Sequence, residues 1–519
     1  MKKADVILYL IVALLCIFSF FLIIYTTPFG IGLSPDSLMY IGTSEGFLSG
    51  RGFEWNGYIL NNFPPFYPFI ISITKIFVGD SLTSARFLQA FLYASNIFLI
   101  SIATYLSSNK NKITAILASL LFLTSTNILK IHNMAWSEPL FILLTLIAYL
   151  LFLKYFSSER FLYIILSAGV ISLAIITRYA GLVFIPPAIL ILFFFDHKPF
   201  RKRFFNVLLY MTISLLPIAL WFLRNKILAV NFANRVFTFH AITGVDIHIL
   251  FRTVFNYWFP VKASYLIRII VVLISIVMFL IIVFKEMINF IKGGKAFSIS
   301  TLSLIFILFL AFSYMFFLTG VMLFFDAATV FDYRMLAPLH IFIVIAFLNL
   351  LSAIEKNRFS FIFKTASYVF TSVVLILNGD ITESSIKRYR KDGQGYTSRK
   401  WRDSEIVEYA NTLPEKTPIY SNGHDVIAFF AGRNAKILPT KYNNTSLLPN
   451  PGFKANMEKL YKEVTENGAL ILYFDKKNTR RNLPDKKDLE NIYNMPVLLK
   501  LDDGKIYGIS QNGKDAGLE

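Results

Sequence analysis

Residues 28–68 read PFGIGLSPDSLMYIGTSEGFLSGRGFEWNGYILNNFPPFYP and form the first long polar break in a very apolar chain. Ser34, Pro35 and Asp36 have the pattern of a helix start, with serine as the N-cap, proline in the first helical position and an acid in the first turn. The stretch closes on the run PPFYP at 64–68. We therefore expect a short helix that begins at Ser34, between two apolar segments.

The composition identifies the bilayer as the main solvent of this chain. It has 519 residues, of which 55% are hydrophobic and 54 are phenylalanine, and its mean hydropathy is +0.58. Soluble domains are rarely so apolar. The net charge of +19 lies mostly in short loops between apolar runs, which indicates membrane topology and not a nucleic-acid-binding face. The single cysteine, Cys16, excludes an intramolecular disulfide.

About eleven segments are candidates for membrane-spanning helices, each of which needs about 20 mostly apolar residues. We therefore expect an α-helical polytopic membrane protein. A shorter apolar run at 66–78 is expected to lie at the interface or to re-enter the membrane. The expected spans are 5–25, 84–106, 113–129, 138–155, 161–177, 180–195, 204–223, 265–284, 299–324, 335–353 and 361–378.

The basic residues between the expected spans predict the orientation of the chain. Lysine and arginine concentrate in cytoplasmic segments of membrane proteins. With a cytoplasmic N-terminus, every expected inner segment is basic, which predicts a multi-pass protein of the plasma (inner) membrane with a long outer loop at 26–83. The inner basic residues are Lys2, Lys3, Lys110, Lys112, Lys154, Arg160, Lys198, Arg201, Lys202, Arg203, Lys285, Lys292, Lys295, Lys356, Arg358 and Lys364.

The composition changes sharply near residue 379, after which the chain is polar. We expect a transmembrane domain at 1–378 and a soluble extracytoplasmic domain at 379–519. Alternating strands and helices in the second part predict a small α/β domain with an accessory or acceptor-binding role. The expected strands are 418–422, 469–474 and 497–501, and the expected helices are 425–431 and 454–465.

Asp36 is the first candidate for chemistry. An acid in a first turn can simply complement the helix dipole, which contributes well under about 1 kcal/mol at an exposed site. However, Asp36, Tyr40 and Thr43 share one helix face at the membrane surface, where an acid has little structural reason to lie. We favour a functional Asp36. Glu45 is half a turn out of phase and is expected to be a solvated surface residue.

Glu138 is the second candidate acid, at the outer end of the span 138–155. With Pro139 at the first helical position it could be an ordinary helix-start residue. It could equally face the same cavity as Asp36, because acids at membrane depth are usually paired or functional. His132 lies nearby, but a lone histidine is more often structural than a ligand. Asp36, His132 and Glu138 therefore give only a weak indication of a divalent metal site.

Three arginines on the expected outer side are not explained by the positive-inside bias. They are Arg178, Arg224 and Arg334. Each could extend its side chain to the interface, and Arg334 could pair with Asp332 two residues before it. Three guanidinium groups at one membrane level also suit an anionic phosphate head group. We count them, with Tyr40 and Tyr67, as candidate substrate-binding residues.

Four places together resemble the GT-C superfamily of polytopic glycosyltransferases, of the bacterial protein mannosyltransferase and aminoarabinose transferase type. They are Ser34-Pro35-Asp36 with the run PPFYP in the first outer loop, Ser137-Glu138, the run TRYAG at 177–181, and Tyr333-Arg334 before Pro338. The resemblance covers the membrane domain. Ser37 departs from the paired Asp-Glu of the protein mannosyltransferases, which puts a protein acceptor in doubt.

The resemblance implies a sugar donor carried on polyprenyl phosphate and used on the outer face, with Asp36 as the base. It leaves a divalent metal open, because some relatives use one and others do not. An acceptor hydroxyl on a lipid, glycan or protein would attack the anomeric carbon with inversion, and the arginines would stabilise the leaving phosphate. The alternative is a lipid or saccharide transporter, for which we expect repeats or broken helices with ionisable residues at mid-membrane.

Overall fold

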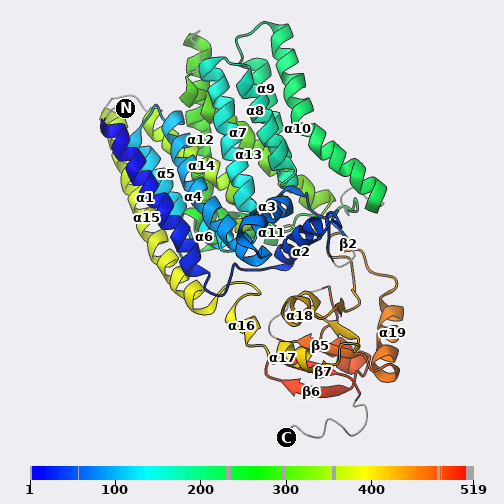
Figure 1. The fold of residues 1–519 in the computed structure, drawn as a ribbon. Coiled ribbons are helices and arrows are strands. Elements are labelled where there is room, and N and C mark those ends of the chain that lie inside the picture. Colours follow the sequence, from blue (N-terminus) through cyan, green and yellow to red (C-terminus); the bar gives the residue numbers. More distant parts are fainter. Residues whose placement is uncertain are drawn as a thin grey trace.

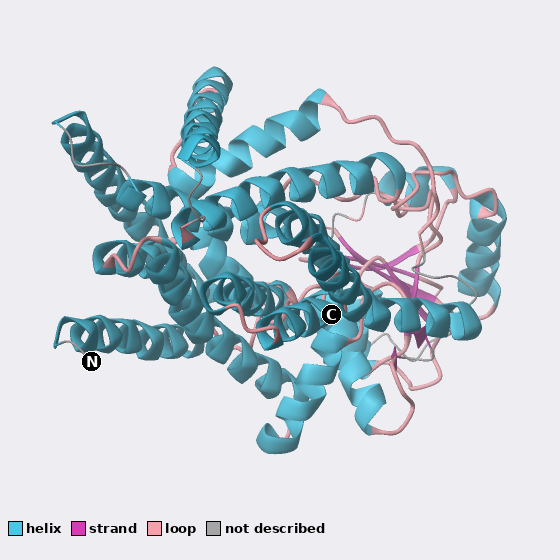
Figure 2. Ribbon diagram, turned by 90° about the horizontal axis from the view of Figure 1, so that it is seen from above, coloured by secondary structure: helices cyan, strands magenta, loops and turns pink. Residues whose placement is uncertain are grey.

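A computed structural model describes residues 3–55, 58–229, 235–293, 298–353, 358–475, 480 and 482–509. A helical bundle forms the larger part of the molecule, and a small sheet with its helices lies beyond one end of the bundle (Figure 1). Seen from above, the strands occupy one part of the molecule only (Figure 2). Lys2, Lys295 and Lys356, named above among the inner basic residues, lie outside the described residues.

The bundle contains a helix at each of the eleven expected spans. Among the described residues, seven helices are long and apolar enough to cross a membrane, or eight if the bent pair α5 and α6 is one span. The number eleven is therefore not confirmed, because several helices are short for a bilayer. The bundle helices are α1 (Lys3–Thr26), α4 (Ser81–Ser107), α5 (Lys112–Thr124), α6 (Thr126–His132), α7 (Glu138–Ser158), α8 (Leu162–Ile175), η1 (Tyr179–Phe184), α9 (Ile185–Phe194), α10 (Phe200–Ala229), α12 (Tyr265–Gly293), α13 (Ile299–Phe324), α14 (Tyr333–Ala353) and α15 (Arg358–Asp392).

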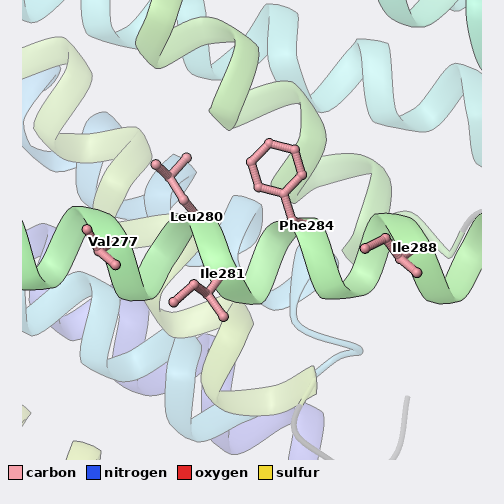
Figure 3. Close-up of a pocket in the computed structure, with 5 residues that line it drawn as sticks. All are labelled: Val277, Leu280, Ile281, Phe284 and Ile288. Carbon is pink, nitrogen blue, oxygen red and sulfur yellow. The ribbon is translucent and has the colours of Figure 1, made fainter.

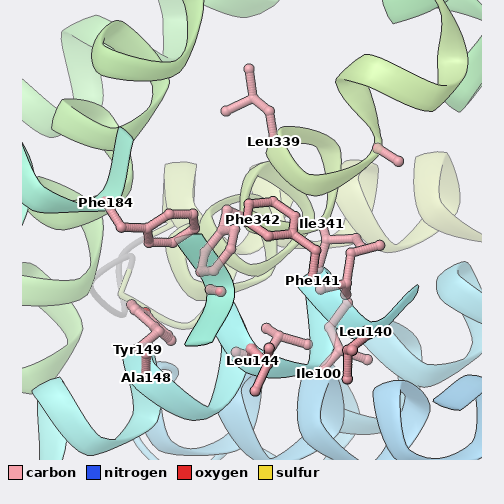
Figure 4. Close-up of a cluster of buried hydrophobic side chains, with 14 of the residues drawn as sticks. Ile100, Leu140, Phe141, Leu144, Ala148, Tyr149, Phe184, Leu339, Ile341 and Phe342 are labelled. Atoms are coloured by element: carbon pink, nitrogen blue, oxygen red, sulfur yellow. The ribbon is translucent and has the colours of Figure 1, made fainter. Parts of the chain in front are cut away.

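Helices α7 and α14 are central to the bundle. In the apolar part of α14, 78% of the residues are buried within the protein, against 28% in α1, α10 and α15. The aromatic rings of Tyr149 and Phe342 meet edge to face at 5.3 Å (Figure 4). The Tyr149 hydroxyl lies 2.5 Å from Ser303 Oγ on α13. Lipid tails are as apolar as leucine, so such packing and hydrogen bonding hold the spans together.

Four elements of the expected outer loop 26–83 and one later helix lie at the end of the bundle that faces the sheet (Figure 1). Helix α2 begins at Pro35, as expected, and α3 covers the short apolar run at 66–78. Two strands of two residues each pair in an antiparallel manner between these helices. The elements are α2 (Pro35–Leu48), β1 (Glu54–Trp55), β2 (Tyr58–Ile59), α3 (Phe66–Val78) and α11 (Gly244–Trp258).

The C-terminal part is an α/β unit with a five-stranded sheet in the order β4-β3-β5-β7-β6. Strand β3 pairs in parallel with β4 and β5, and β7 is antiparallel to β5 and β6. The three strands and two helices expected from the sequence are present. The elements are α16 (Arg399–Arg402), α17 (Glu405–Thr412), β3 (Ile419–Ser421), α18 (His424–Ala431), β4 (Ala435–Ile437), α19 (Phe453–Glu466), β5 (Leu470–Phe474), η2 (Asp488–Ile492), β6 (Val497–Leu501) and β7 (Gly504–Tyr507).

The junction between the two parts is ordered through backbone contacts. Helix α15 continues to Asp392, beyond the expected domain boundary at 378. The chain then passes beside the segment that leads into α2, where Tyr396 N donates to Leu33 O at 2.9 Å. Gly395 lies against the same residue with φ +62°. The sheet unit is thereby fixed to the loop that precedes Asp36.

Substituting Gly395 tests this junction. A Cβ atom at Gly395 would lie 2.1 Å from Leu33 O, a backbone atom that cannot rotate away. Gly432 has nearly the same φ, +61°, with open space around its Cβ position, so it is a matched control. Gly432→Ala should cost only the left-handed backbone strain, about 1 kcal/mol. Gly395→Ala should lower the thermal unfolding temperature clearly further in detergent, and equal shifts for the two variants would contradict the docked junction.

Candidate active site

The start of α2 positions Asp36. Ser34 is the N-cap, and its Oγ accepts from Ser37 N at 3.4 Å, with Pro35 in the first turn. Trp136 fixes the same serine, because its Nε1 donates to Ser34 Oγ at 2.8 Å. The predicted helix start is confirmed, and it is attached to the loop that leads into α7.

Glu138 is the first residue of α7, and its side chain is fully buried. One carboxylate oxygen, Oε1, accepts from Arg178 Nη1 at 2.5 Å and also from Arg334 Nε. Arg178 precedes the short helix η1, and its Nη1 also donates to Ser137 Oγ at 3.1 Å. Two of the three predicted outer arginines therefore converge on one buried acid.

Arg334 joins this buried acid to Asp36. It lies in the first turn of α14, where its Nη1 donates to Asp36 Oδ2 at 2.7 Å. Its guanidinium carbon lies 4.3 Å from the centre of the Trp136 ring, which is within the range of a cation–π contact. Helices α2, α7 and α14 thus meet at one guanidinium group.

The expected alternative, a pair between Arg334 and Asp332, is wrong. Asp332 Oδ1 accepts from Met335 N at 2.9 Å, so this carboxylate caps α14. Burial raises the pKa of Asp332. Asp332 therefore accepts a hydrogen bond from a backbone N–H group at the start of α14. Arg334 pairs instead with acids that are distant in the sequence.

The two carboxylates of the cluster differ in access. The Asp36 side chain is 29% exposed, whereas that of Glu138 is 0% exposed. Within the described residues, Glu138 Oε2 is buried without a hydrogen-bond partner. Two acids and two guanidinium groups give a locally neutral cluster, in which only Asp36 offers solvent or a substrate a reachable carboxylate.

Tyr40 and Tyr67 line the inner side of this cluster and are both buried. Their rings meet edge to face at 5.1 Å, and the Tyr40 hydroxyl lies 3.4 Å from Ser137 Oγ. The Tyr67 hydroxyl accepts from Gln89 Nε2 at 2.7 Å. Burial raises the pKa of both tyrosines, and the charge of Asp36 raises that of Tyr40 further. In this arrangement they support α2 and the start of α7 as neutral groups.

Arg224 and His132 lie apart from the cluster. Arg224 Nη1 donates to Leu60 O at 2.8 Å, and its guanidinium carbon is 4.7 Å from the centre of the Trp221 ring. His132 is buried, with Nδ1 at 2.8 Å from Ile128 O. The structure therefore does not bring these two candidates together with Asp36.

The acids of the cluster do not fit a divalent metal in this arrangement. No group of three or more metal-ligating residues is found among the described residues. The Asp36 and Glu138 carboxylates both bind the Arg334 guanidinium, which occupies the position that a cation would take. His132 bonds elsewhere, so the triad considered from the sequence does not form, and we derive no step through a metal.

Sequence reasoning missed three residues around the cluster: Trp136, Ser137 as a hydrogen-bond partner, and Lys130. Lys130 Nζ lies 4.3 Å from the centre of the Tyr333 ring, next to Arg334 in the sequence. Lys130 carried a usable signal, because it is basic on the expected outer side like the three arginines. Trp136 carried none beyond its place before Ser137 and Glu138.

An open apolar depression of ≈ 430 Å³ lies on the surface of α12 (Figure 3). Its lining consists of Val277, Leu280, Ile281, Phe284 and Ile288, all from one helix. It shares no residue with the cluster formed by α2, α7 and α14. The charged cluster, and not this depression, is therefore the candidate active site.

The chain has the fold of the GT-C superfamily of polytopic glycosyltransferases, and the resemblance drawn from the sequence is confirmed at this level. The family model for dolichyl-phosphate-mannose-protein mannosyltransferases matches residues 62–222, which include Glu138 and Arg178 but neither Asp36 nor Arg334. No curated protein matches the chain in sequence.

Solved structures resemble the chain over most of its length. ArnT from Cupriavidus metallidurans bound to undecaprenyl phosphate is 12% identical with a TM-score of 0.58, and the match covers 98% of each chain. The apo state of the same enzyme is 12% identical with a TM-score of 0.56, covering 97% of this chain and 98% of that one. The oligosaccharyltransferase of Archaeoglobus fulgidus, tethered with an acceptor peptide, is 13% identical with a TM-score of 0.51, covering 87% and 69%.

Removing the Glu138 carboxylate should destabilise the protein. Glu138→Gln leaves Arg178 and Arg334 without their shared buried acid, and breaking a buried ion pair typically costs about 3–5 kcal/mol. Asp36→Asn is the matched control, because Asp36 is partly exposed and shares only Arg334. Thermal unfolding in detergent should place Glu138→Gln clearly below Asp36→Asn. The reverse order would contradict the role of Glu138 as the anchor of both arginines.

Proposed function

We propose that the protein is an integral-membrane glycosyltransferase that moves a sugar from a polyprenyl-phosphate donor to an acceptor hydroxyl. The observation that carries this proposal is the contact of Asp36 with Arg334, at 2.7 Å, within the fold of the GT-C superfamily. A reachable carboxylate beside a guanidinium group places a candidate base next to a candidate phosphate-binding group. Both groups are needed when a hydroxyl displaces a phosphate from a sugar.

The proposed reaction is a direct displacement at the anomeric carbon. The acceptor oxygen forms a bond to that carbon while its proton passes to Asp36, and the bond from the carbon to the phosphate oxygen breaks. The anomeric configuration inverts. The phosphate changes from a diester with one negative charge to a monoester approaching two, so Arg334 and Arg178 stabilise the leaving group more than the bound donor.

Glu138 has a positioning role in this proposal. It is fully buried and holds both guanidinium groups through one oxygen, so it fixes the two cations where the phosphate charge develops. Tyr40 and Tyr67 stabilise the start of α2 and of α7 around this cluster. Their rings contact each other, Tyr40 bonds to Ser137, and Tyr67 bonds to Gln89. We assign substrate contact to Asp36, Arg178 and Arg334, and none to Arg224.

The proposed setting is the outer face of a plasma membrane, with a cytoplasmic N-terminus and the sheet unit extracytoplasmic. Helix α2 and the sheet unit lie at the same end of the bundle, so the base and the C-terminal unit share one side of the membrane (Figure 1). One related structure holds undecaprenyl phosphate and another an acceptor peptide. These ligands support a lipid-phosphate donor and an acceptor that approaches from the aqueous side.

Asp36→Asn tests the base. The variant keeps the shape of the side chain but cannot take the acceptor proton, so the transfer rate should fall by roughly 10²–10⁴-fold while donor binding persists. Glu45→Gln is the control, because Glu45 is an exposed acid on the same helix that contacts Lys75 at 3.7 Å. Turnover measured with a panel of polyprenyl-phosphate sugars should be unchanged in this control. Full turnover in Asp36→Asn would sink the assignment and favour the transporter alternative.

Arginine variants test the phosphate site. Charge-assisted hydrogen bonds contribute about 1.5–3 kcal/mol each, so Arg178→Ala and Arg334→Ala should each weaken donor binding by at least tenfold. Arg224→Ala is the control, because Arg224 is expected at the same membrane level but bonds to Leu60 and Asn225. This variant should bind the donor as the wild type does. Donor-dependent thermal stabilisation measures all three. Equal losses in all three variants would contradict a phosphate site at Arg178 and Arg334.

A further inference from the structure

The end of α15 and the helix α16 form a strongly basic segment. Residues 387–402 read KRYRKDGQGYTSRKWR, with seven basic residues and one acid, Asp392. The segment begins where α15 leaves the bundle and ends in the connection to the sheet unit. We call it the basic segment below.

The arginines of the basic segment lie around the end of α1. The Arg390 guanidinium carbon is 4.9 Å from the centre of the Tyr25 ring, and those of Arg399 and Arg402 are 5.3 Å and 5.6 Å from the Phe29 ring. Arg402 Nη2 also donates to Phe29 O at 2.9 Å. Three guanidinium groups from two helices thus lie against two aromatic residues, Tyr25 in the last turn of α1 and Phe29 just after it.

These cations lack acidic partners. Within the described residues, Arg390, Arg399 and Arg402 form no ion pair, whereas Lys387 pairs with Glu383 at 2.6 Å. All three arginine side chains are exposed. A gathering of unneutralised cations repels itself, so it is stabilised when an anion binds.

The basic segment lies at the membrane surface, on the side of Asp36. Helices α1 and α15 run side by side through the bundle, and α16 lies between the bundle and the sheet unit (Figure 1). The candidate span of α1 ends at Thr26, and Arg390 in the polar last turns of α15 lies beside Tyr25 at that end. The positive-inside bias does not explain a basic cluster on this side, since the basic loops that set the orientation lie at the opposite end.

We propose that the basic segment binds the phosphate of an anionic lipid head group, with Arg390, Arg399 and Arg402 as its ligands. Clusters of basic residues directly beside a membrane span attract anionic lipids, at about 1 kcal/mol for each lysine or arginine. The planar guanidinium fork matches phosphate oxygens, and the lipid tails would lie along the exposed apolar faces of α1 and α15. This site is separate from the donor site and does not depend on the proposed transfer.

A bound head group would contact the segment that carries Asp36. Phe29 belongs to the connection from α1 to α2, and Thr397 Oγ1 from the basic segment donates to Ile31 O at 2.9 Å. Arg86 fixes the same connection from α4, with Nε donating to Thr27 Oγ1 at 2.9 Å. The lipid site therefore lies against the chain that leads into the helix of the base.

The test uses the full chain in a neutral detergent at low salt. Binding of dioctanoyl phosphatidylglycerol is measured by thermophoresis, with dioctanoyl phosphatidylcholine and inorganic phosphate as separate probes. The variant is Arg390→Gln, Arg399→Gln and Arg402→Gln together. The matched control removes three exposed cations from α19 of the sheet unit by Lys454→Gln, Lys459→Gln and Lys462→Gln. If the triple arginine variant unfolds, Arg390→Gln with Arg399→Gln is compared with Lys454→Gln and Lys459→Gln.

The wild type and the lysine control should bind phosphatidylglycerol equally, and the arginine variant at least tenfold more weakly. Binding should fall with added salt, and phosphatidylcholine should not compete. Equal affinity in the arginine variant and the lysine control would overturn the proposal. Displacement of the lipid by inorganic phosphate at a similar dissociation constant would assign the site to free phosphate and overturn the lipid assignment. The measurement uses no sugar donor and no transfer step, so its outcome is independent of the transferase proposal.

Discussion

The buried carboxylate of Glu138 is the constraint on which the site depends. A charge without water is costly, and Glu138 is stable there because Arg178 and Arg334 both donate to one of its oxygens. These partners come from the start of η1 and the start of α14, so a single acid fixes the relative positions of three elements. Arg334 also forms an ion pair with Asp36 through its Nη1 atom.

This arrangement gives the two acids different tasks. Glu138 is inaccessible and already shared, whereas Asp36 is partly exposed and holds only one guanidinium nitrogen. A phosphate that enters the site would compete with Asp36 for Arg334. Arrival of the donor would then free the carboxylate that takes the acceptor proton, and departure of the phosphate would restore the pair. In the proposed reaction, binding of the donor and activation of the base would therefore be coupled through the Arg334 side chain.

Local patterns of the sequence predict the elements but not their meeting points. The N-cap at Ser34, the apolar periods of the bundle and three strands of the sheet follow from short-range rules, and all are found. Strands β4 and β7 were missed, because their sequences, AKI and GKIY, contain no run of three apolar residues such as those in β5 and β6. The extension of α15 to Asp392 was missed because its last turns are polar.

Long-range charge pairing was the hardest feature to predict. Arg334 and Asp36 are 298 positions apart, whereas Asp332 is two residues away and is used by the backbone of α14. Glu138 was identified as an acid that could face the cavity of Asp36, and the structure joins the two through Arg334. Arg224 was predicted from the same kind of signal as Arg178 and Arg334, an arginine on the expected outer side. In the structure it contacts a backbone carbonyl and a tryptophan ring and not an acid of the cluster. A sequence gives the level of such a residue in the membrane, but packing decides its partner.

The most direct measurement is the affinity of a polyprenyl phosphate for the wild type and for Asp36→Asn, with Glu45→Gln as the control. Asp36 occupies Arg334 and repels an anion, so Asp36→Asn should bind the phosphate more tightly than the wild type, while Glu45→Gln should be unchanged. Equal or weaker binding by Asp36→Asn would contradict the competition of phosphate and Asp36 for Arg334.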